Sequence, residues 1–320
     1  MLTEIIYLLI SFFCTAILGK LIIPVLKKLK VGQSERLDGP RTHLRKQGTP
    51  TMGGIMMIIT IIVFVIIATC LNTKYANVIL PVTFASIGFG LVGFVDDFKK
   101  VVLKNTDGIS PKMKLLGQLI ISTIYILILQ RVIGLGTDIK IPIINYTLNL
   151  PMYIYIPFMI LVMLGATNAV NLTDGVDGLA GSVSAIMIGA LSVISFRNEI
   201  FGLSLFGAIV CGAVAGFLIY NFHKAKVMMG DTGSLLLGGV ISSMAIYMKN
   251  PFILIVIAFI PIIETLSVIL QVLSVRFTGK RMFKMSPLHH HFELTGWREN
   301  KVVFVFSMIT LLMSIVAILL

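Results

Sequence analysis

The chain has 320 residues, of which 57% are hydrophobic and 12% charged, and its formal net charge at pH 7 is +12. Soluble domains carry about 25% charged residues, so this composition excludes a soluble globular protein. The lysines and arginines gather in a few connections between apolar stretches. The positive charge therefore describes one face of a membrane protein, suited to anionic lipids and substrates, and does not indicate nucleic-acid binding.

Ten apolar stretches recur along the chain, and a transmembrane helix needs about 20 apolar residues. They predict an all-α, polytopic integral membrane protein with about ten transmembrane helices. We expect one transmembrane domain over residues 1–320, without a soluble domain. The predicted spans are 3–26, 52–71, 78–95, 113–132, 152–168, 179–197, 200–222, 232–248, 251–275 and 301–320.

The basic residues predict the orientation. Seven fall in 27–51, five in 96–114, two in 222–231 and six in 276–301. By the positive-inside rule these connections face the cytoplasm, and both termini face the extracytoplasmic side.

Most acids and histidines fall on the same predicted face, which indicates a site that opens to the cytoplasm. A transporter would place its ionisable groups nearer the middle of the membrane. Glu264 is the one acid deep in a predicted span, and Gln271 follows it two turns later on the same face. We expect a buried polar contact between helices there.

VDDFKK (95–100) ends an apolar stretch in two adjacent carboxylates, Asp96 and Asp97. Lys99 and Lys100 stand three and four residues beyond Asp96, so exposed ion pairs are one interpretation. A site for a divalent metal or a proton acceptor is the other.

Two further stretches place acids beside glycines. In TNAVNLTDGVDGLAGS (167–182), Asp174 and Asp177 share one face if helical, or cap the next helix. In MMGDTGSLLLGG (228–239), Asp231 stands at the start of an apolar helix. The Asp231 side chain could cap this helix start, or the helix start could bind phosphate.

SPLHHHFE (286–293) holds three consecutive histidines, which cannot share one helical face. One metal ion is therefore not expected to take all three, whereas one or two could hydrogen-bond phosphate or act as acid–base groups. Gly88-x-Gly90-x-x-Gly93 formally matches a dinucleotide fingerprint but lies inside a predicted span, where it predicts close helix packing instead.

The predicted cytoplasmic face thus carries carboxylates, lysines, histidines and glycine-rich helix starts. Clustered carboxylates suit Mg²⁺, which prefers oxygen ligands, and lysines suit phosphate groups. The predicted substrates are a nucleotide-type diphosphate and a lipid phosphate.

A resemblance to a known family extends over essentially the whole chain and rests on five motifs and their order. The motifs are GTPTMGG (48–54), GFVDDFKK (93–100), NAVNLTDGVDGL (168–179), MGDTGSL (229–235) and PLHHHFE (287–293). The chain resembles the phospho-N-acetylmuramoyl-pentapeptide-transferases, the MraY-type translocases of bacterial cell-wall synthesis. The aspartate motifs are shared with the wider polyprenyl-phosphate sugar-1-phosphate transferase superfamily. The HHHFE form is typical of the muramoyl-pentapeptide branch.

The resemblance implies that UDP-MurNAc-pentapeptide and undecaprenyl phosphate react to give UMP and lipid I. It implies a multi-pass protein of the bacterial cytoplasmic membrane that uses Mg²⁺, and it is compatible with a homodimer. One departure concerns uracil, because the family often stacks an aromatic residue where this chain has Met228. A sulfur–ring contact would take its place.

The resemblance also implies residue roles. Catalytic roles fall on Asp96, Asp97, Asp231 and His289, with Asp231 and Asp97 as Mg²⁺ ligands. Substrate-binding roles fall on Lys46, Lys112, Asn171, Asp174, Asp177, Gly230, Ser234, Gln271 and His290.

Other functions stay open at this point. A sister transferase that uses UDP-N-acetylglucosamine would share the aspartates but not the histidine loop. A proton-coupled transporter would show internal repeats and midplane charges, and a non-catalytic scaffold would leave the clustered acids unexplained. Direct attack by the lipid phosphate and a two-step route through an aspartate are both compatible with the residues.

Overall fold

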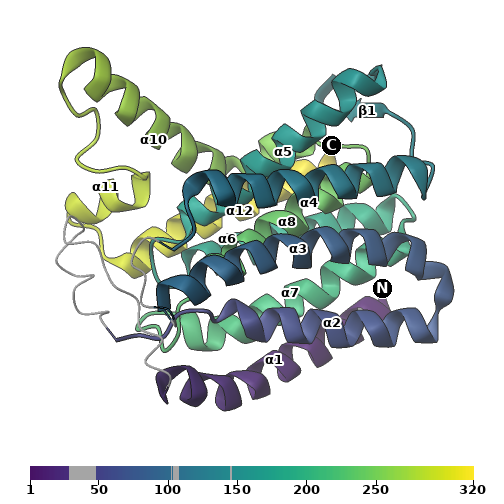
Figure 1. Ribbon diagram of the computed structural model, residues 1–320, viewed down its shortest axis with the longest axis horizontal. Helices are drawn as coiled ribbons and strands as arrows, with labels where there is room; N and C mark the ends of the chain where they lie inside the picture. Colours follow the sequence, from purple (N-terminus) through teal and green to yellow (C-terminus); the bar gives the residue numbers. More distant parts are fainter. Residues whose placement is uncertain (29–47, 102, 104–107, 145) are drawn as a thin grey trace.

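The chain folds into a bundle of long helices (Figure 1). The computed structural model describes residues 1–28, 48–101, 103, 108–144 and 146–320. Its helices are α1 (Leu2–Lys28), α2 (Gly54–Leu71), α3 (Ala76–Val101), α4 (Pro111–Arg131), α5 (Met152–Thr173), α6 (Leu179–Arg197), α7 (Phe201–Asn221), α8 (Gly230–Tyr247), α9 (Ile253–Ile257), α10 (Phe259–Thr278), α11 (Leu288–Leu294) and α12 (Glu299–Leu319), with short 3-10 turns η2 (Thr73–Tyr75) and η3 (Pro142–Ile144).

Within the described residues, nine helices are long and apolar enough to cross a membrane, which confirms the polytopic, all-α prediction. The remaining predicted span corresponds to α8, which is rich in glycine and serine and falls outside that group. All of its residues from Thr232 to Tyr247 are buried. Because α8 faces other helices rather than lipid, small and polar residues are tolerated along it.

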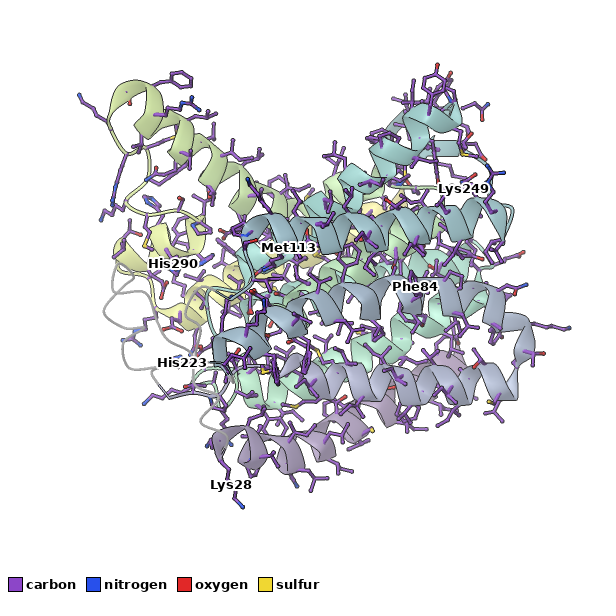
Figure 2. The ribbon with its side chains drawn as sticks, viewed as in Figure 1. Lys28, Phe84, Met113, His223, Lys249 and His290 are labelled. Atoms are coloured by element: carbon purple, nitrogen blue, oxygen red, sulfur yellow. The ribbon has the colours of Figure 1, made fainter. Side chains whose placement is uncertain are left out.

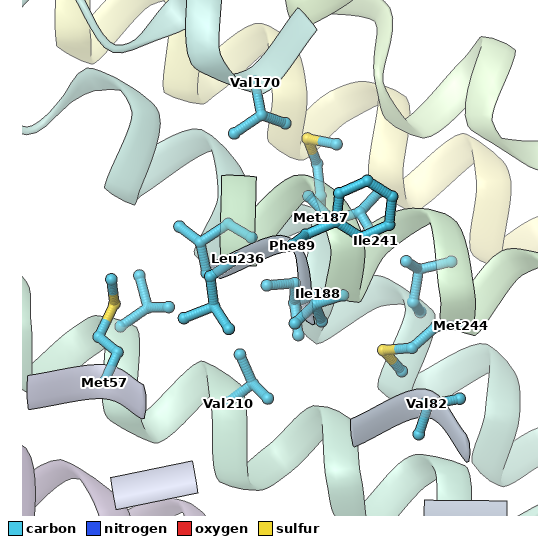
Figure 3. Packing of buried hydrophobic residues seen from close by; sticks show 14 of the residues in the cluster. Met57, Val82, Phe89, Val170, Met187, Ile188, Val210, Leu236, Ile241 and Met244 are labelled. Carbon is cyan, nitrogen blue, oxygen red and sulfur yellow. The ribbon is translucent and has the colours of Figure 1, made fainter. Parts of the chain in front are cut away.

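The core is built around α8. Leu236, Ile241 and Met244 of this helix lie among side chains of the neighbouring helices, such as Phe89 of α3 and Met187 of α6, and all five are fully buried (Figure 3). Within a bilayer, helices are held together by close packing rather than by exclusion of water. The fit of α8 among its neighbours is therefore a main source of stability.

Glycines of α3 allow two helices to approach it closely. A Cβ at Gly93 would overlap the carbonyl oxygen of Asp231 at the start of α8, and one at Gly88 would stand 2.9 Å from the Ile121 side chain of α4. The expectation that this glycine pattern serves helix packing is confirmed.

The predicted span 251–275 is divided into α9 and α10, with a break at Ala258. Pro261 explains the break, since it lacks the N–H that would bond Ile257 and its ring clashes with the carbonyl of that residue. Beyond the break, α10 projects from the bundle at the upper left of Figure 1.

A β-hairpin between α4 and α5 was not predicted. Strands β1 (Asp138–Ile141) and β2 (Tyr146–Asn149) pair antiparallel, with Asp138 opposite Asn149. Lys249, just beyond α8, bonds Asp138 Oδ1 at 2.6 Å, and this hydrogen bond lowers the pKa of the Asp138 carboxyl. The hairpin is thereby tied to the end of α8.

The two ends of the bundle differ. Lys28, His223 and His290 lie at the left-hand end in Figure 2, whereas Lys249 and the chain termini lie toward the other end (Figures 1 and 2). The histidine motif and the segment before α8 are thus gathered at one end.

We expect Gly93→Ala to lower the melting temperature of the detergent-purified protein, because the new methyl group overlaps the α8 backbone and overpacking costs about 1–3 kcal/mol. Gly165→Ala in α5 is the matched control, since a Cβ there meets no described atom within 4 Å. Equal melting temperatures for the two variants would contradict the proposed tight α3–α8 contact.

Candidate active site

The last turns of α3 carry the first acidic motif. The helix was predicted to end at residue 95 but continues to Val101, so Asp96, Asp97 and Lys100 all lie on it. Lys100 Nζ lies 2.6 Å from Asp96 Oδ2, the i,i+4 ion pair that the sequence allowed. Asp96 also accepts a hydrogen bond of 2.8 Å from the backbone N–H of Ile109.

Asp231, from the start of α8, joins this pair. Its Oδ2 lies 2.8 Å from Lys114 Nζ and 3.2 Å from Lys100 Nζ, and Lys114 Nζ lies 3.8 Å from Asp96 Oδ2. Three helices, α3, α4 and α8, thus bring two carboxylates and two ammonium groups together. We call Asp96, Lys100, Lys114 and Asp231 the Asp–Lys cluster.

Asn171 of α5 completes the surroundings of Asp231. With its amide in the orientation that satisfies both neighbours, the nitrogen donates to Asp231 Oδ1 at 3.3 Å and the oxygen accepts from Lys114 Nζ at 3.0 Å. The structure therefore brings three of the predicted site residues, Asp96, Asp231 and Asn171, to one place.

The charge state of Asp231 follows from its neighbours. Burial alone would raise its pKa, but the hydrogen bond with Asp96 and the charges of Lys114 and Lys100 outweigh burial and hold the pKa of Asp231 below its usual range. Asp231 is consequently an ionised carboxylate at neutral pH. Its side chain is 18% exposed, so it remains accessible to a ligand.

Asp97 has a different environment. Its Oδ1 accepts from the Asp231 backbone N–H at 3.2 Å, and its Oδ2 accepts from the Thr232 N–H at 2.9 Å and the Thr232 hydroxyl at 2.6 Å. The first N–H groups of a helix lack partners within it. Asp97 supplies those partners from another helix and so fixes where α8 begins.

The GTPTMGG motif reaches the same helix start. Met228 N–H donates to Pro50 O at 2.7 Å, and the N–H groups of Gly53 and Gly54 donate to Met228 O and Met229 O. Gly230 then adopts a left-handed φ of 72° directly before Asp231. Met228 is buried in this backbone pairing.

Asp177 lies in a second polar group. Its Oδ2 accepts from Ala225 N–H at 3.1 Å and lies 3.5 Å from His223 Nδ1, which in turn lies 3.6 Å from Glu299 Oε2. Among the described residues, Asp177, His223 and Glu299 could together approach one metal ion. Asp174, three residues earlier, is the C-cap residue of α5, and its N–H donates to Asn171 O.

Other predicted site residues occupy separate surroundings. Ser234 is buried and donates to Gly230 O at 3.2 Å, while the Gln271 amide holds the backbone of Met282 and Phe283. His290 pairs with Glu293 at 2.9 Å. Lys112 is exposed at the start of α4, and Lys46 lies outside the described residues.

Histidine 289 is fully buried against Glu264, which confirms the expected polar contact of Glu264 between helices. Its catalytic role stays a prediction, as do the substrate-binding roles of the residues just described.

Sequence reasoning missed Lys114 and Thr232. Lys112 and Lys114 lie two residues apart, about 200° around a helix, so only one of them can face the carboxylates. The sequence offered no signal for which one. For Thr232, its place directly after Asp231 at a helix start was such a signal.

Comparison with known proteins adds to this geometry. The model of glycosyl transferase family 4 matches residues 79–249, more than half of the chain. A phospho-N-acetylmuramoyl-pentapeptide-transferase of Halalkalibacterium halodurans is 46% identical over 311 residues, covering 97% of this chain and 95% of that protein. Proteins of the same name from Bacillus subtilis (44% identity; 97% and 95% covered) and Staphylococcus carnosus (46%; 96% and 96%) are also similar.

The fold and the matched family define a polytopic membrane transferase of glycosyl transferase family 4. At this identity over nearly its whole length, the chain belongs to the phospho-N-acetylmuramoyl-pentapeptide-transferase family.

We expect Asp97→Asn to destabilise the protein by about 1 kcal/mol, because loss of a helix cap typically costs this much. Thr232→Val should lower the stability by less than Asp97→Asn does. The double variant should lose less stability than the sum of the two single losses, since both changes break the same contacts. Thermal melting of the three variants in detergent checks this. Additive losses would contradict a capping role for Asp97.

Proposed function

We propose that this protein transfers phospho-N-acetylmuramoyl-pentapeptide from its UDP-activated form to undecaprenyl phosphate, giving lipid I and UMP in the first membrane step of peptidoglycan synthesis. The observation that carries the proposal is the Asp–Lys cluster, two carboxylates and two lysines from three helices. The names of relatives at 44–46% identity support the same reaction.

The lysines suit a diphosphate. Lys100 and Lys114 are neutralised by Asp96 and Asp231, and both ammonium groups lie within 3.2 Å of one carboxylate oxygen. A diphosphate that enters the cluster would accept hydrogen bonds from these ammonium groups. The carboxylates would then keep the lysines in position, as phosphoryl transfer requires mainly positioning and charge neutralisation.

The donors also fit a magnesium ion. Asp231 is an ionised carboxylate with the Asn171 amide beside it, and Mg²⁺ prefers oxygen ligands. When bound, Mg²⁺ would neutralise the diphosphate and stabilise the departing UMP. Asp97, the other predicted ligand, would have to give up hydrogen bonds to α8 to bind an ion. We therefore assign the direct contact to Asp231.

In the proposed reaction a lipid-phosphate oxygen attacks the β-phosphorus of the UDP-sugar. The new P–O bond forms as the bond to the bridging oxygen breaks, and the electron pair leaves with UMP. A phosphate monoester has a second pKa of about 6, so no strong base is needed. Asp96, held by Lys100 and the Ile109 N–H, would orient the lipid phosphate rather than deprotonate it.

The alternative two-step route, with an aspartate as nucleophile, predicts UMP release without lipid phosphate. Absence of such release in a single-turnover experiment would support direct attack.

The site is proposed to face the cytoplasm of a bacterial plasma membrane, because the basic connections follow the positive-inside rule. This orientation would give soluble UDP-MurNAc-pentapeptide direct access. A homodimer stays a prediction that the oligomeric state in detergent would check.

Incubation of the purified protein with undecaprenyl phosphate, Mg²⁺ and UDP-MurNAc-pentapeptide should release UMP and a lipid-linked product. Asp231→Asn should abolish turnover while the protein stays folded, because the carboxylate proposed to bind the metal is lost. If UMP is released with UDP-N-acetylglucosamine but not with UDP-MurNAc-pentapeptide, the sister transferase is favoured. No UMP from either sugar would favour a transporter or a scaffold.

Lys114→Met should lower turnover about tenfold to a hundredfold, since a hydrogen bond to a charged group contributes about 1.5–3 kcal/mol. Lys112→Met, which changes an exposed residue of the same helix, is the control and should lower turnover far less. A larger loss for Lys112→Met would restore the original expectation that Lys112 contacts the substrate.

A further inference from the structure

Glu264, His289 and Gly175 form a buried chain of contacts outside the Asp–Lys cluster. Glu264 belongs to α10, His289 to α11, and Gly175 to the turn between α5 and α6. The carboxylate and the imidazole are each no more than 1% exposed. Three segments far apart in the sequence are therefore joined through two ionisable side chains.

Glu264 fixes both the position and the orientation of the histidine. Its Oε1 accepts from the His289 backbone N–H at 3.1 Å, and its Oε2 lies 3.2 Å from ring Nδ1. A proton on Nδ1 lets both N–H groups of His289 donate to Glu264, and Nε2 then points away from Glu264.

On its far side the ring meets the backbone of the turn. Nε2 is buried and has no hydrogen-bond partner among the described residues. A Cβ added at Gly175 would overlap Nε2 and would stand 2.8 Å from Cε1. Gly175 is thus a position where the imidazole occupies the space that a side chain would need.

This buried contact makes a proton-transfer role for His289 unfavourable. An N–H donor at Nε2 would face the Gly175 backbone and meet no hydrogen-bond acceptor among the described residues. A ring enclosed between Glu264 and this turn can instead set the position of both segments.

We propose that Glu264 and His289 are positioning residues that set the turn Asp174-Gly175-Val176-Asp177 for the UDP-sugar, with His289 acting through the turn rather than in the chemical step. This inference rests on the proposed function and deepens it. It links the histidine motif to the acids of the α5–α6 turn. Binding of the UDP-sugar should depend on Glu264 and His289, and binding of undecaprenyl phosphate should not.

The steady-state test measures KM for each substrate separately in Glu264→Gln and His289→Asn. A glutamine cannot accept from both His289 N–H groups, because one end of its amide is a donor. We expect KM for the UDP-sugar to rise about tenfold, within the usual range of coupling between contacting groups. KM for undecaprenyl phosphate should change little, and the variants are compared at a temperature at which thermal melting shows that both are folded.

A double-mutant cycle tests the ring–turn contact directly. Gly175→Ala should raise KM for the UDP-sugar in the wild-type background but much less in His289→Ala, where the ring that it would meet is gone. Gly165→Ala serves as the matched control for an added methyl group. This cycle also keeps the test available if Glu264→Gln does not fold.

Two failures are distinguishable. If the wild-type protein releases no UMP, the proposed function fails. If the wild type turns over, the inference is overturned by an unchanged KM for the UDP-sugar, by a loss confined to kcat, or by additive effects of Gly175→Ala and His289→Ala.

Discussion

The contact between α3 and the first turn of α8 determines where the charged groups lie. Gly93 lets the carbonyl of Asp231 lie against α3, and Asp97, one turn further along α3, accepts the first N–H groups of α8. Because both interactions act on the same helix start, Asp231 is placed beside Asp96 and Lys100. A shift of α8 by one residue would turn the Asp231 side chain about 100° away.

That placement has an electrostatic consequence. Asp96 and Asp231 would repel each other if they met alone in a buried setting, where charges interact more strongly than in water. Lys100 and Lys114 lie against both of them, and the positive charges of the two lysines offset this repulsion. An anionic substrate that enters the cluster could take over contacts of both lysines, which an isolated acid or base could not offer.

Much of this arrangement was predictable from the sequence, because hydrophobic length identifies spans and charge placement identifies a face. The meeting of Asp96 with Asp231 was expected from their shared setting at helix ends. The presence of Lys114 in the cluster was not expected, since the rotation of α4 about its axis decides whether Lys112 or Lys114 faces the carboxylates. The break at Ala258 was not predicted, because a proline does not always interrupt a helix, as Pro81 inside α3 shows. The hairpin at Asp138 was too short to stand out from the connections.

The sequence left each acidic motif with two interpretations, a structural cap or a chemical group, and the structure shows why they were hard to separate. Asp96, Asp97, Asp177 and Glu264 each accept a hydrogen bond from a backbone N–H of another segment. Backbone donors near a membrane must be satisfied within the protein, because lipid offers no acceptors. A carboxylate that does so also fixes the segment that it holds. In this fold the acids therefore position loops and helix starts. Among the described contacts, the Asp231 carboxylate is held by side chains and by no backbone N–H, so within the cluster it is the acid left for a substrate or an ion.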